Sequence, residues 1–175
     1  MPLSWLIRVF LVALLVHVPA PILAEEPLAQ VQAAYFFNFL KFATWPATAD
    51  PTTLHVRILR DKKIHDALLD AAGTSIHGKN LDIRLGVTPD DLTGANAVFI
   101  SKDSAPDIPP PTWKQLGSTM LVVSDWDRAL DHGATIQLQT MGGKLRFAVN
   151  LNSARQSGLE ISSRLLRLAS EVRGE

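Results

Sequence analysis

The sequence predicts a single α/β domain with a mixed, mostly parallel sheet that includes one antiparallel hairpin and has helices on both faces. Three features lead to this prediction: an aromatic-rich opening helix, two strands that are apolar at every position, and two alternating strands joined by a Gly-Gly turn. A strand that is apolar throughout is typical of a parallel sheet covered on both sides, since each face then needs apolar cover.

Residues 33–46 form the most distinctive segment of the chain, with four Phe, one Tyr and one Trp in fourteen residues. The apolar positions recur at helical spacing, and Pro46 ends the helix because the residue before a proline disfavours the helical conformation. The expected core-facing stripe runs through Leu28, Val31, Tyr35, Phe39 and Phe42, flanked by Phe36, Leu40 and Ala43.

The middle of the chain alternates strand-like and helix-like patterns, which indicates parallel strands joined by helical connections. In chain order we expect a strand at 54–59, a helix at 62–72 ended by Gly73, a strand at 80–87, an apolar strand at 97–100, a Pro-rich linker at 104–111, a brief helix at 113–116 and a second apolar strand at 120–123.

The expected hairpin joins residues 135–139 to residues 145–149 through Gly142-Gly143, because two adjacent glycines permit the positive φ angles of a tight turn. This turn fixes the register: it places Ile136 opposite Val149, Leu138 opposite Phe147, Gln139 opposite Arg146 and Thr135 opposite Asn150.

Two helices are expected to close the domain. Asn152 caps a short helix that ends near Gly158. The last helix spans about 162–172 and buries an apolar stripe made of Ile161, Leu165, Leu168 and Val172.

The first 24 residues are typical of a cleavable signal peptide: Arg8 precedes an apolar run over 9–16, and Ala24 precedes a plausible cleavage point. The run is shorter than the roughly 20 apolar residues of a membrane span, although an uncleaved anchor is the alternative. We therefore expect an exported, periplasmic domain over 25–175, with no other segment suited to crossing a bilayer.

Composition excludes two classes of function. Loss of Arg8 with the leader changes the formal net charge from zero to minus one, so no positive field would attract nucleic acid. The chain has no cysteine, which excludes thiol-based redox sensing.

The best candidates for acid–base catalysis or metal binding follow one apolar strand, where Asp125, Asp127, Asp131 and His132 lie close in sequence. An exported hydrolase using this cluster is the least favoured hypothesis, because Asp125 also fits a helix cap and Asp131 precedes a turn at Gly133. The other histidines lack paired ligand spacing, so we expect no metal, no cofactor and no catalytic residue.

A small-molecule site is the second hypothesis, since ligands of α/β sheets bind at the carboxyl ends of the strands. Ser101, Ser124 and Asp125 follow the two apolar strands and are the candidate ligand-binding residues. The ligand would be a small molecule or a cell-wall fragment sensed in the periplasm.

Phe37 is an aromatic residue on the least apolar stripe of the opening helix, among Gln30, Ala34, Asn38 and Lys41. A large aromatic there is a candidate contact for another protein, unless a neighbouring loop covers it. Trp45 and Trp113 are weaker candidates. The predicted partner-binding residues are Phe37, Asn38, Lys41, Trp45 and Arg146.

Blocks along nearly the whole domain resemble the YfiR family. They are Asn38-Phe39, Lys41-Phe42 and Trp45-Pro46; then 98–101; then Val122-Val123-Ser124-Asp125, His132-Gly133, Arg146-Phe147, Val149-Asn150, Gly158-Leu159 and 165–169.

The resemblance implies an exported α/β protein without enzymatic activity. It would restrain an inner-membrane signalling enzyme, a diguanylate cyclase or a sensor kinase, by binding its periplasmic domain, and so act on cyclic di-GMP signalling and biofilm formation. It also admits a homodimer. The sequence leaves open whether Lys41 and Arg146 face a partner, a dimer mate or water.

Three positions depart from the pattern of many relatives. Asn96 stands near a position where those relatives carry cysteine, Ala134 replaces a glycine, and Ala148 replaces a glutamate. Redox control therefore does not carry over, and the loss of the acidic group puts any contact it makes in doubt.

Overall fold

The computed structural model describes residues 25–46, 50, 52–70 and 75–174. The expected signal peptide, residues 1–24, and the expected helix end at Gly73 lie outside these residues. Within the described ranges, no helix is both long enough and apolar enough to cross a membrane.

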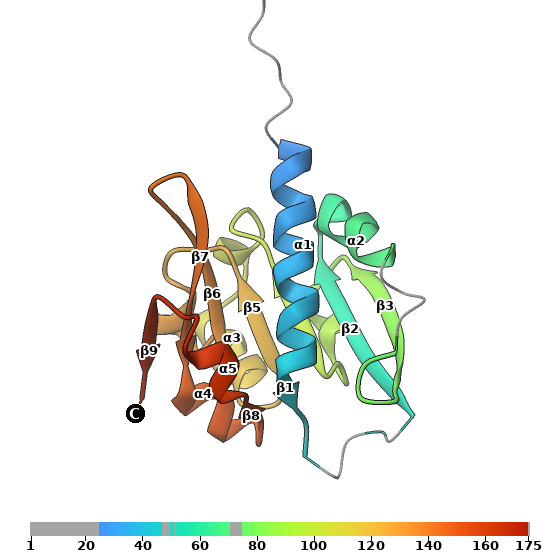
Figure 1. The fold of residues 1–175 in the computed structure, drawn as a ribbon. Coiled ribbons are helices and arrows are strands. Elements are labelled where there is room, and N and C mark those ends of the chain that lie inside the picture. The colour runs from blue at the N-terminus through green and yellow to red at the C-terminus, as the bar shows by residue number, and fades with distance from the viewer. Residues whose placement is uncertain (1–24, 47–49, 51, 71–74, 175) are drawn as a thin grey trace, which may run out of the picture.

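A seven-stranded sheet forms the centre of the molecule, and all of its neighbouring strands are parallel except for one hairpin (Figure 1). In spatial order the strands are β3 (Asn80–Gly86), β2 (Thr53–Leu59), β4 (Ala97–Ile100), β5 (Leu121–Ser124), β6 (Ile136–Met141), β7 (Lys144–Asn150) and β9 (Glu171–Arg173). A separate antiparallel pair joins β1 (Ala43–Thr44) to β8 (Glu160–Ile161).

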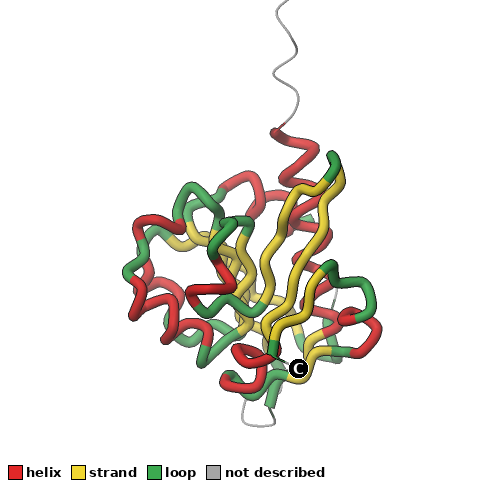
Figure 2. The backbone as a smooth tube through the Cα atoms, turned by 90° about the vertical axis from the view of Figure 1, so that its left-hand side faces the viewer, coloured by secondary structure: helices red, strands yellow, loops and turns green. Residues whose placement is uncertain are grey.

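Helices lie on both faces of the sheet, as expected (Figures 1 and 2). One face carries α1 (Glu25–Phe42) and α2 (Lys62–Leu69), and the other carries α3 (Pro110–Gly117). The shorter helical elements are α4 (Leu151–Gln156), α5 (Ser163–Leu166) and the 3-10 turns η1 (Pro89–Leu92), η2 (Ala105–Asp107) and η3 (Ala129–His132).

The alternation of side chains along the central strands explains why those strands are apolar throughout. Phe99 of β4 points to the layer of α1, where its ring lies 5.7 Å from that of Phe36. Val98 and Ile100 point the other way and join the cluster around Trp113 of α3, which is fully buried. Each face of β4 is therefore packed against its own hydrophobic core.

The hairpin has the expected register. Ile136 pairs with Val149, Leu138 with Phe147 and Gln139 with Arg146. Gly142 and Gly143 have φ angles of 57° and 71°, which an L side chain would adopt only under strain.

The expected core stripe of α1 is confirmed from Tyr35 onward, where Phe36, Phe39, Leu40 and Ala43 are buried, and is wrong for its first two residues. Leu28 and Val31 are 39% and 44% exposed, whereas Ala29 and Ala33 are buried. The buried face runs on through Phe36, Leu40 and Ala43. Ala29 and Ala33 belong to the hydrophobic core, whereas Leu28 and Val31 lie outside it.

The expected C-terminal helix over 162–172 is also wrong. Ser162 caps only a single turn, α5, and the chain then returns as β9, where Ala148 pairs with Glu171 and Val149 with Val172. Pairing with the free edge of β7 outweighs the helical spacing, and it leaves Leu168 66% exposed instead of buried.

The cap of α4 is Asn150 and not Asn152. The Asn150 side chain accepts hydrogen bonds from the backbone N–H groups of Asn152 and Ser153. The helix therefore starts immediately after β7.

Gly117→Ala tests the packing of α3 against the turn at Gly133. A Cβ atom on Gly117 would lie 2.0 Å from the carbonyl oxygen of Gly133, so the backbone must move. We expect the free energy of unfolding, measured by urea titration, to fall by about 1–3 kcal/mol. Gln115→Ala, at an exposed position on the same helix, is the control and should change stability little; equal stability of both variants would contradict the packing.

Candidate interaction surface

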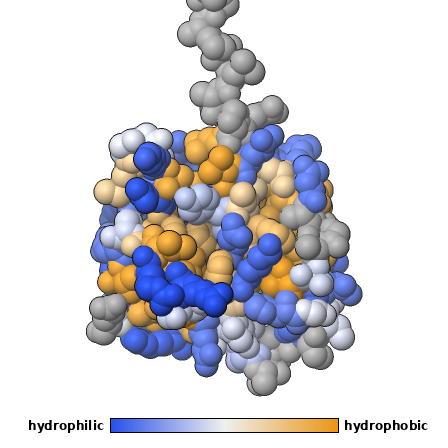
Figure 3. Space-filling model, viewed as in Figure 1, coloured by the Kyte–Doolittle hydropathy of each residue, from blue (hydrophilic) through white to orange (hydrophobic). Residues whose placement is uncertain are grey.

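A groove of about 450 Å³ lies between α1, β7 and the segment around α5. It brings together Asn38 and Arg146, two of the predicted partner-binding residues, which are 108 positions apart in the chain. Figure 3 shows this face of the molecule, where hydrophobic surface lies beside strongly hydrophilic side chains. The lining residues are Tyr35, Asn38, Phe39, Phe42, Arg146, Phe147, Leu165 and Leu168.

The floor of the groove is an aromatic cluster. The ring of Phe39 lies 5.0 Å from that of Phe147 and 6.0 Å from that of Tyr35. The Tyr35 hydroxyl donates a hydrogen bond to the carbonyl oxygen of Leu145, at 3.2 Å, which fixes the ring. Leu168 stands exposed at the rim. The groove thus combines rigid aromatic walls with exposed apolar surface, a combination enriched at protein interfaces.

Phe37 and Lys41 lie one helical turn apart on α1, and neither residue lines the groove; Phe37 packs in part against the core. Phe37 is half-buried, and the Lys41 ammonium lies 4.1 Å from the centre of its ring. Lys41 therefore covers part of the Phe37 ring, and a partner that approaches this side would meet both residues together.

Arg146 lines the groove, and two further arginines neighbour its lining residues Leu165 and Leu168 in the sequence. Arg146 of β7, Arg164 of α5 and Arg167, which follows it, are all exposed. Among the residues that the structure describes, no ion pair involves any of the three. Arg146 therefore offers positive charge to an acidic group in the groove.

The two tryptophan candidates lie elsewhere and serve the fold. Trp45 is half-buried, and its indole N–H donates to the carbonyl oxygen of Asn96 at 2.9 Å. Trp113 has no exposed surface, so it is not available to a partner. Neither residue lines the groove.

The predicted ligand-binding residues meet at the carboxyl edge of the sheet, but they differ in exposure. Ser124 is fully buried, and its hydroxyl accepts from the backbone N–H of Trp126 at 3.1 Å. Ser101 is 6% exposed and donates to the hydroxyl of Ser104. Only Asp125 reaches the surface to a substantial degree.

Asp125 ties together the loops after β4 and β5 and helix α1. Its carboxylate accepts from the backbone N–H of Lys102 at 2.6 Å and from the side-chain amide of Gln32 at 3.0 Å. It caps no helix. A crevice of about 530 Å³ opens beside it, lined by Leu28, Gln32, Lys102, Asp103, Asp125, Trp126, Asp127, Leu138, Gln139, Thr140 and Leu145.

Asp131 and His132, which lie near Asp125 in the sequence, make contacts that are separate from those of Asp125. Asp131 pairs with Arg173 at 2.8 Å and so tethers β9 to η3. The His132 ring stacks on Trp126 with a centroid separation of 4.9 Å. Within the described ranges, no group of three His, Cys, Asp or Glu side chains is arranged to hold a metal ion.

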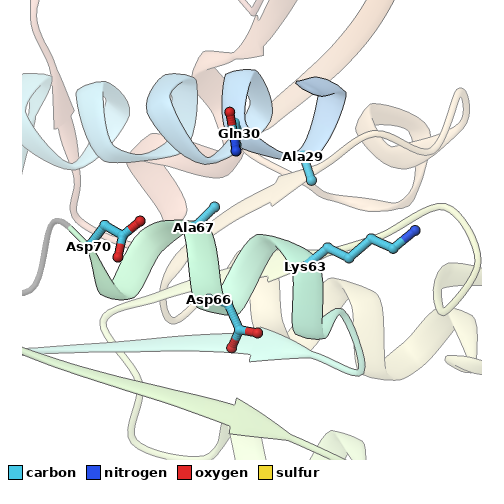
Figure 4. Close-up of a pocket in the computed structure, with 6 residues that line it drawn as sticks. All are labelled: Ala29, Gln30, Lys63, Asp66, Ala67 and Asp70. Atoms are coloured by element: carbon cyan, nitrogen blue, oxygen red, sulfur yellow. The ribbon is translucent and has the colours of Figure 1, made fainter. Parts of the chain in front are cut away.

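A further hollow of about 500 Å³, which the sequence patterns did not indicate, lies between α1 and α2. In Figure 4, Ala29 and Ala67 point into this space from the two helices, while Asp66 points away from α1. The alanines leave the space open because they have only a methyl group. The remaining lining residues are Gln30, Lys63 and Asp70.

The chain belongs to the YfiR/HmsC-like family, whose model matches residues 29–170. This is a regulatory rather than a catalytic family, and it is periplasmic. The matched range contains the whole groove and all residues of the strand-end crevice except Leu28.

Two solved structures are similar to this chain at low sequence identity. The ABC domain from Streptococcus pneumoniae in complex with L-Trp is 12% identical with a TM-score of 0.52, over 82% of this chain and 60% of that one. A conserved domain protein from Vibrio cholerae O1 biovar El Tor is 10% identical with a TM-score of 0.48, over 83% of this chain and 60% of that one. The chain thus covers less than two thirds of either structure, and the first shows a shared fold alone.

Asp125→Ala tests whether this carboxylate is structural. The change leaves the Gln32 amide, which is 7% exposed, and the Lys102 N–H without their acceptor. We expect the free energy of unfolding to fall by about 1–3 kcal/mol in urea titration. Asp127→Ala, at an exposed neighbour, should have little effect; unchanged stability of Asp125→Ala would contradict the structural role.

Proposed function

We propose that this chain is a periplasmic regulatory binding protein that restrains an inner-membrane signalling enzyme. The enzyme is a diguanylate cyclase or a sensor kinase, and the contact is with its periplasmic domain. The observation that carries the proposal is the family match over residues 29–170, because that family is regulatory.

The groove formed by α1, β7 and α5 is the proposed contact surface. It offers an aromatic floor, the exposed Leu168 and the exposed guanidinium of Arg146. Aromatic and arginine side chains supply a large share of binding energy at protein interfaces. A fitting partner segment would place an apolar side chain on the floor and a carboxylate at the rim.

Phe37 and Lys41 lie on α1 outside the lining of the groove, and we include them in the proposed contact because their side chains lie together on the same helix as Asn38. Trp45, by contrast, has its N–H engaged within the domain. The proposed contact therefore centres on Phe37, Asn38, Lys41 and Arg146.

Crosslinking in cells, followed by capture of the tagged protein, tests this function. We expect wild type to capture an inner-membrane cyclase or kinase, and Arg146→Glu to capture it at least about tenfold less, a loss of about 1.4 kcal/mol in binding. Phe37→Glu should act in the same direction. Lys114→Glu is the control, because Lys114 is exposed on α3, across the sheet from the groove.

The outcomes of this experiment distinguish a failure of the regulatory function from a failure of the proposed contact surface. Capture by wild type and by all variants would keep the regulatory role and discard this groove. Absence of any inner-membrane protein from the wild-type sample, with the fold intact by circular dichroism, would contradict the role itself.

A periplasmic small-molecule sensor is the second candidate, and the crevice at the carboxyl ends of β4 and β5 favours it. In parallel sheets this edge is the usual ligand site. The crevice pairs apolar walls from Leu28 and Leu145 with charged groups from Lys102 and Asp103. The two candidates are compatible, since a ligand shifts a regulator between states only if it binds one of them better.

Thermal unfolding with a panel of small molecules and cell-wall fragments tests the sensor. A ligand at 100 times its Kd should stabilise the protein by about 2.7 kcal/mol and raise Tm. Thr140→Trp places a large ring in the crevice and should abolish the shift, whereas Lys114→Trp should keep it. Melting curves that stay flat across the panel would count against this candidate.

A further inference from the structure

The crevice at the carboxyl ends of β4 and β5 continues into a smaller hollow of about 120 Å³. The two spaces share part of their lining, which consists of Leu28, Gln32, Lys102, Asp103 and Asp125. A ligand in the crevice meets this shared lining whichever space it enters first. The functional groups of the lining therefore decide which class of ligand fits.

Gln32 supplies a nearly buried hydrogen-bond acceptor to the crevice. The residue is 7% exposed, and its side-chain amide nitrogen donates to the Asp125 carboxylate at 3.0 Å. An ionised carboxylate only accepts, so the amide turns its NH₂ group toward Asp125 and its carbonyl oxygen elsewhere. In the part of the chain that the structure describes, no group donates to this oxygen, and it is not sealed from solvent. Because Gln32 lines both spaces, the oxygen opens on the crevice without a donor.

An acceptor in such a position favours a ligand that donates. A polar atom that is largely removed from water costs free energy unless it is hydrogen-bonded. The oxygen of Gln32 is fixed by the bond that the same amide makes to Asp125. A donor group on a ligand would therefore meet an acceptor that is already oriented.

Carboxylates outnumber cations around the crevice. Three carboxylates line it, and the only ammonium group among its lining residues is that of Lys102, which gives the lining a formal charge of minus two. The carboxylates belong to Asp103, Asp125 and Asp127. Asp103 and Asp127 are exposed, and within the described ranges neither takes part in an ion pair. The chain as a whole is formally neutral, so this negative charge is a local property.

Apolar side chains lie beside these acceptors. Leu28 of α1 is 39% exposed, Leu138 of β6 is buried, and Leu145 of β7 is half-buried. Contact with such side chains removes the apolar surface of a ligand from water, which favours binding. A fitting ligand therefore combines an apolar body with hydrogen-bond donors and a positive charge.

We infer that the crevice binds an amphipathic primary amine, an organic cation that joins one ammonium group to an apolar chain or ring. An ammonium group carries three donors and no acceptor, which matches the free oxygen of Gln32 and the carboxylates of Asp103 and Asp127. The apolar body would lie against Leu28 and Leu145. The inference rests on the sensor candidate stated above, and it is independent of the regulatory groove.

Other classes of ligand match the lining less well. Among the described residues, no three His, Cys, Asp or Glu side chains are arranged to hold a metal ion. An anion would meet a net negative charge. A neutral apolar molecule would leave the oxygen of Gln32 without a donor. The expected selectivity is therefore for positive charge and hydrocarbon together.

Titration of the purified protein with n-hexylamine, followed by protein NMR, tests this selectivity. Hexylamine is protonated at neutral pH, as is a lysine side chain with its pKa of about 10.4. We expect saturable shifts of the Gln32 side-chain amide and the Lys102 backbone amide. The matched compounds are hexan-1-ol, hexanoate, methylammonium and Mg²⁺, and each should bind at least about tenfold more weakly than hexylamine.

Variants place the amine in the crevice. Asp103→Asn and Asp127→Asn keep the size of the side chain but remove its charge, and each should raise the Kd of hexylamine at least about threefold. Asp90→Asn removes the same charge from an exposed position in η1 that lines neither space, so it should leave the Kd unchanged. Thr140→Trp fills the crevice and should abolish the shifts.

Hexanoate or Mg²⁺ that binds as tightly as hexylamine would overturn the inference, and so would hexylamine binding that survives Thr140→Trp. A folded protein that shows no shift with hexylamine would also overturn it. If another member of the small-molecule panel then binds in the crevice, the sensor candidate stands and only the amine class fails. If no member binds, both fail.

Discussion

The packing of α1 against the sheet is the interaction on which the rest of the molecule depends. Phe36 and Phe99 form its centre, and the buried face of α1 continues through Ala33 and Leu40. Once that face is fixed, the opposite face must be exposed, because a helix has only one face toward the sheet. The same contact therefore builds the core and sets Asn38 and Lys41 on the surface, with Phe37 half-buried beside them.

The second half of the candidate surface depends on how the chain closes the sheet. β7 places Arg146 beside Asn38, and the short α5 with the return to β9 leaves Leu168 at the rim. The sequence pattern had placed Leu168 on the buried face of a longer helix, but it is 66% exposed. The groove therefore forms because the C-terminal segment pairs with the edge of β7 as a strand and does not continue as a helix.

The sequence predicted what depends on local pattern. Two-sided burial of β4 followed from its unbroken apolar run, and the register of Ile136 with Val149 followed from the Gly-Gly turn. The sequence-based prediction failed where contacts between residues far apart in the chain determine the structure. Helical spacing over 162–172 competed with the open edge of β7, and the buried face of α1 includes Ala29 and Ala33 instead of Leu28 and Val31.

The candidate site was accessible to sequence reasoning only in part. Asn38 and Arg146 were singled out separately, and the topology brought them into one groove. Nothing in local spacing indicated that Tyr35, Phe147 and Leu168 would join them. The full burial of Ser124 was equally hidden, because a serine after an apolar strand can face the crevice or the core.

The central claim is that binding of this protein restrains an inner-membrane signalling enzyme. The most direct measurement is the activity of the captured enzyme in isolated membranes, with increasing amounts of the purified protein added. The account predicts a decrease in activity that saturates with wild type, and little decrease with Arg146→Glu. Unchanged or increased activity while wild type is bound would contradict it.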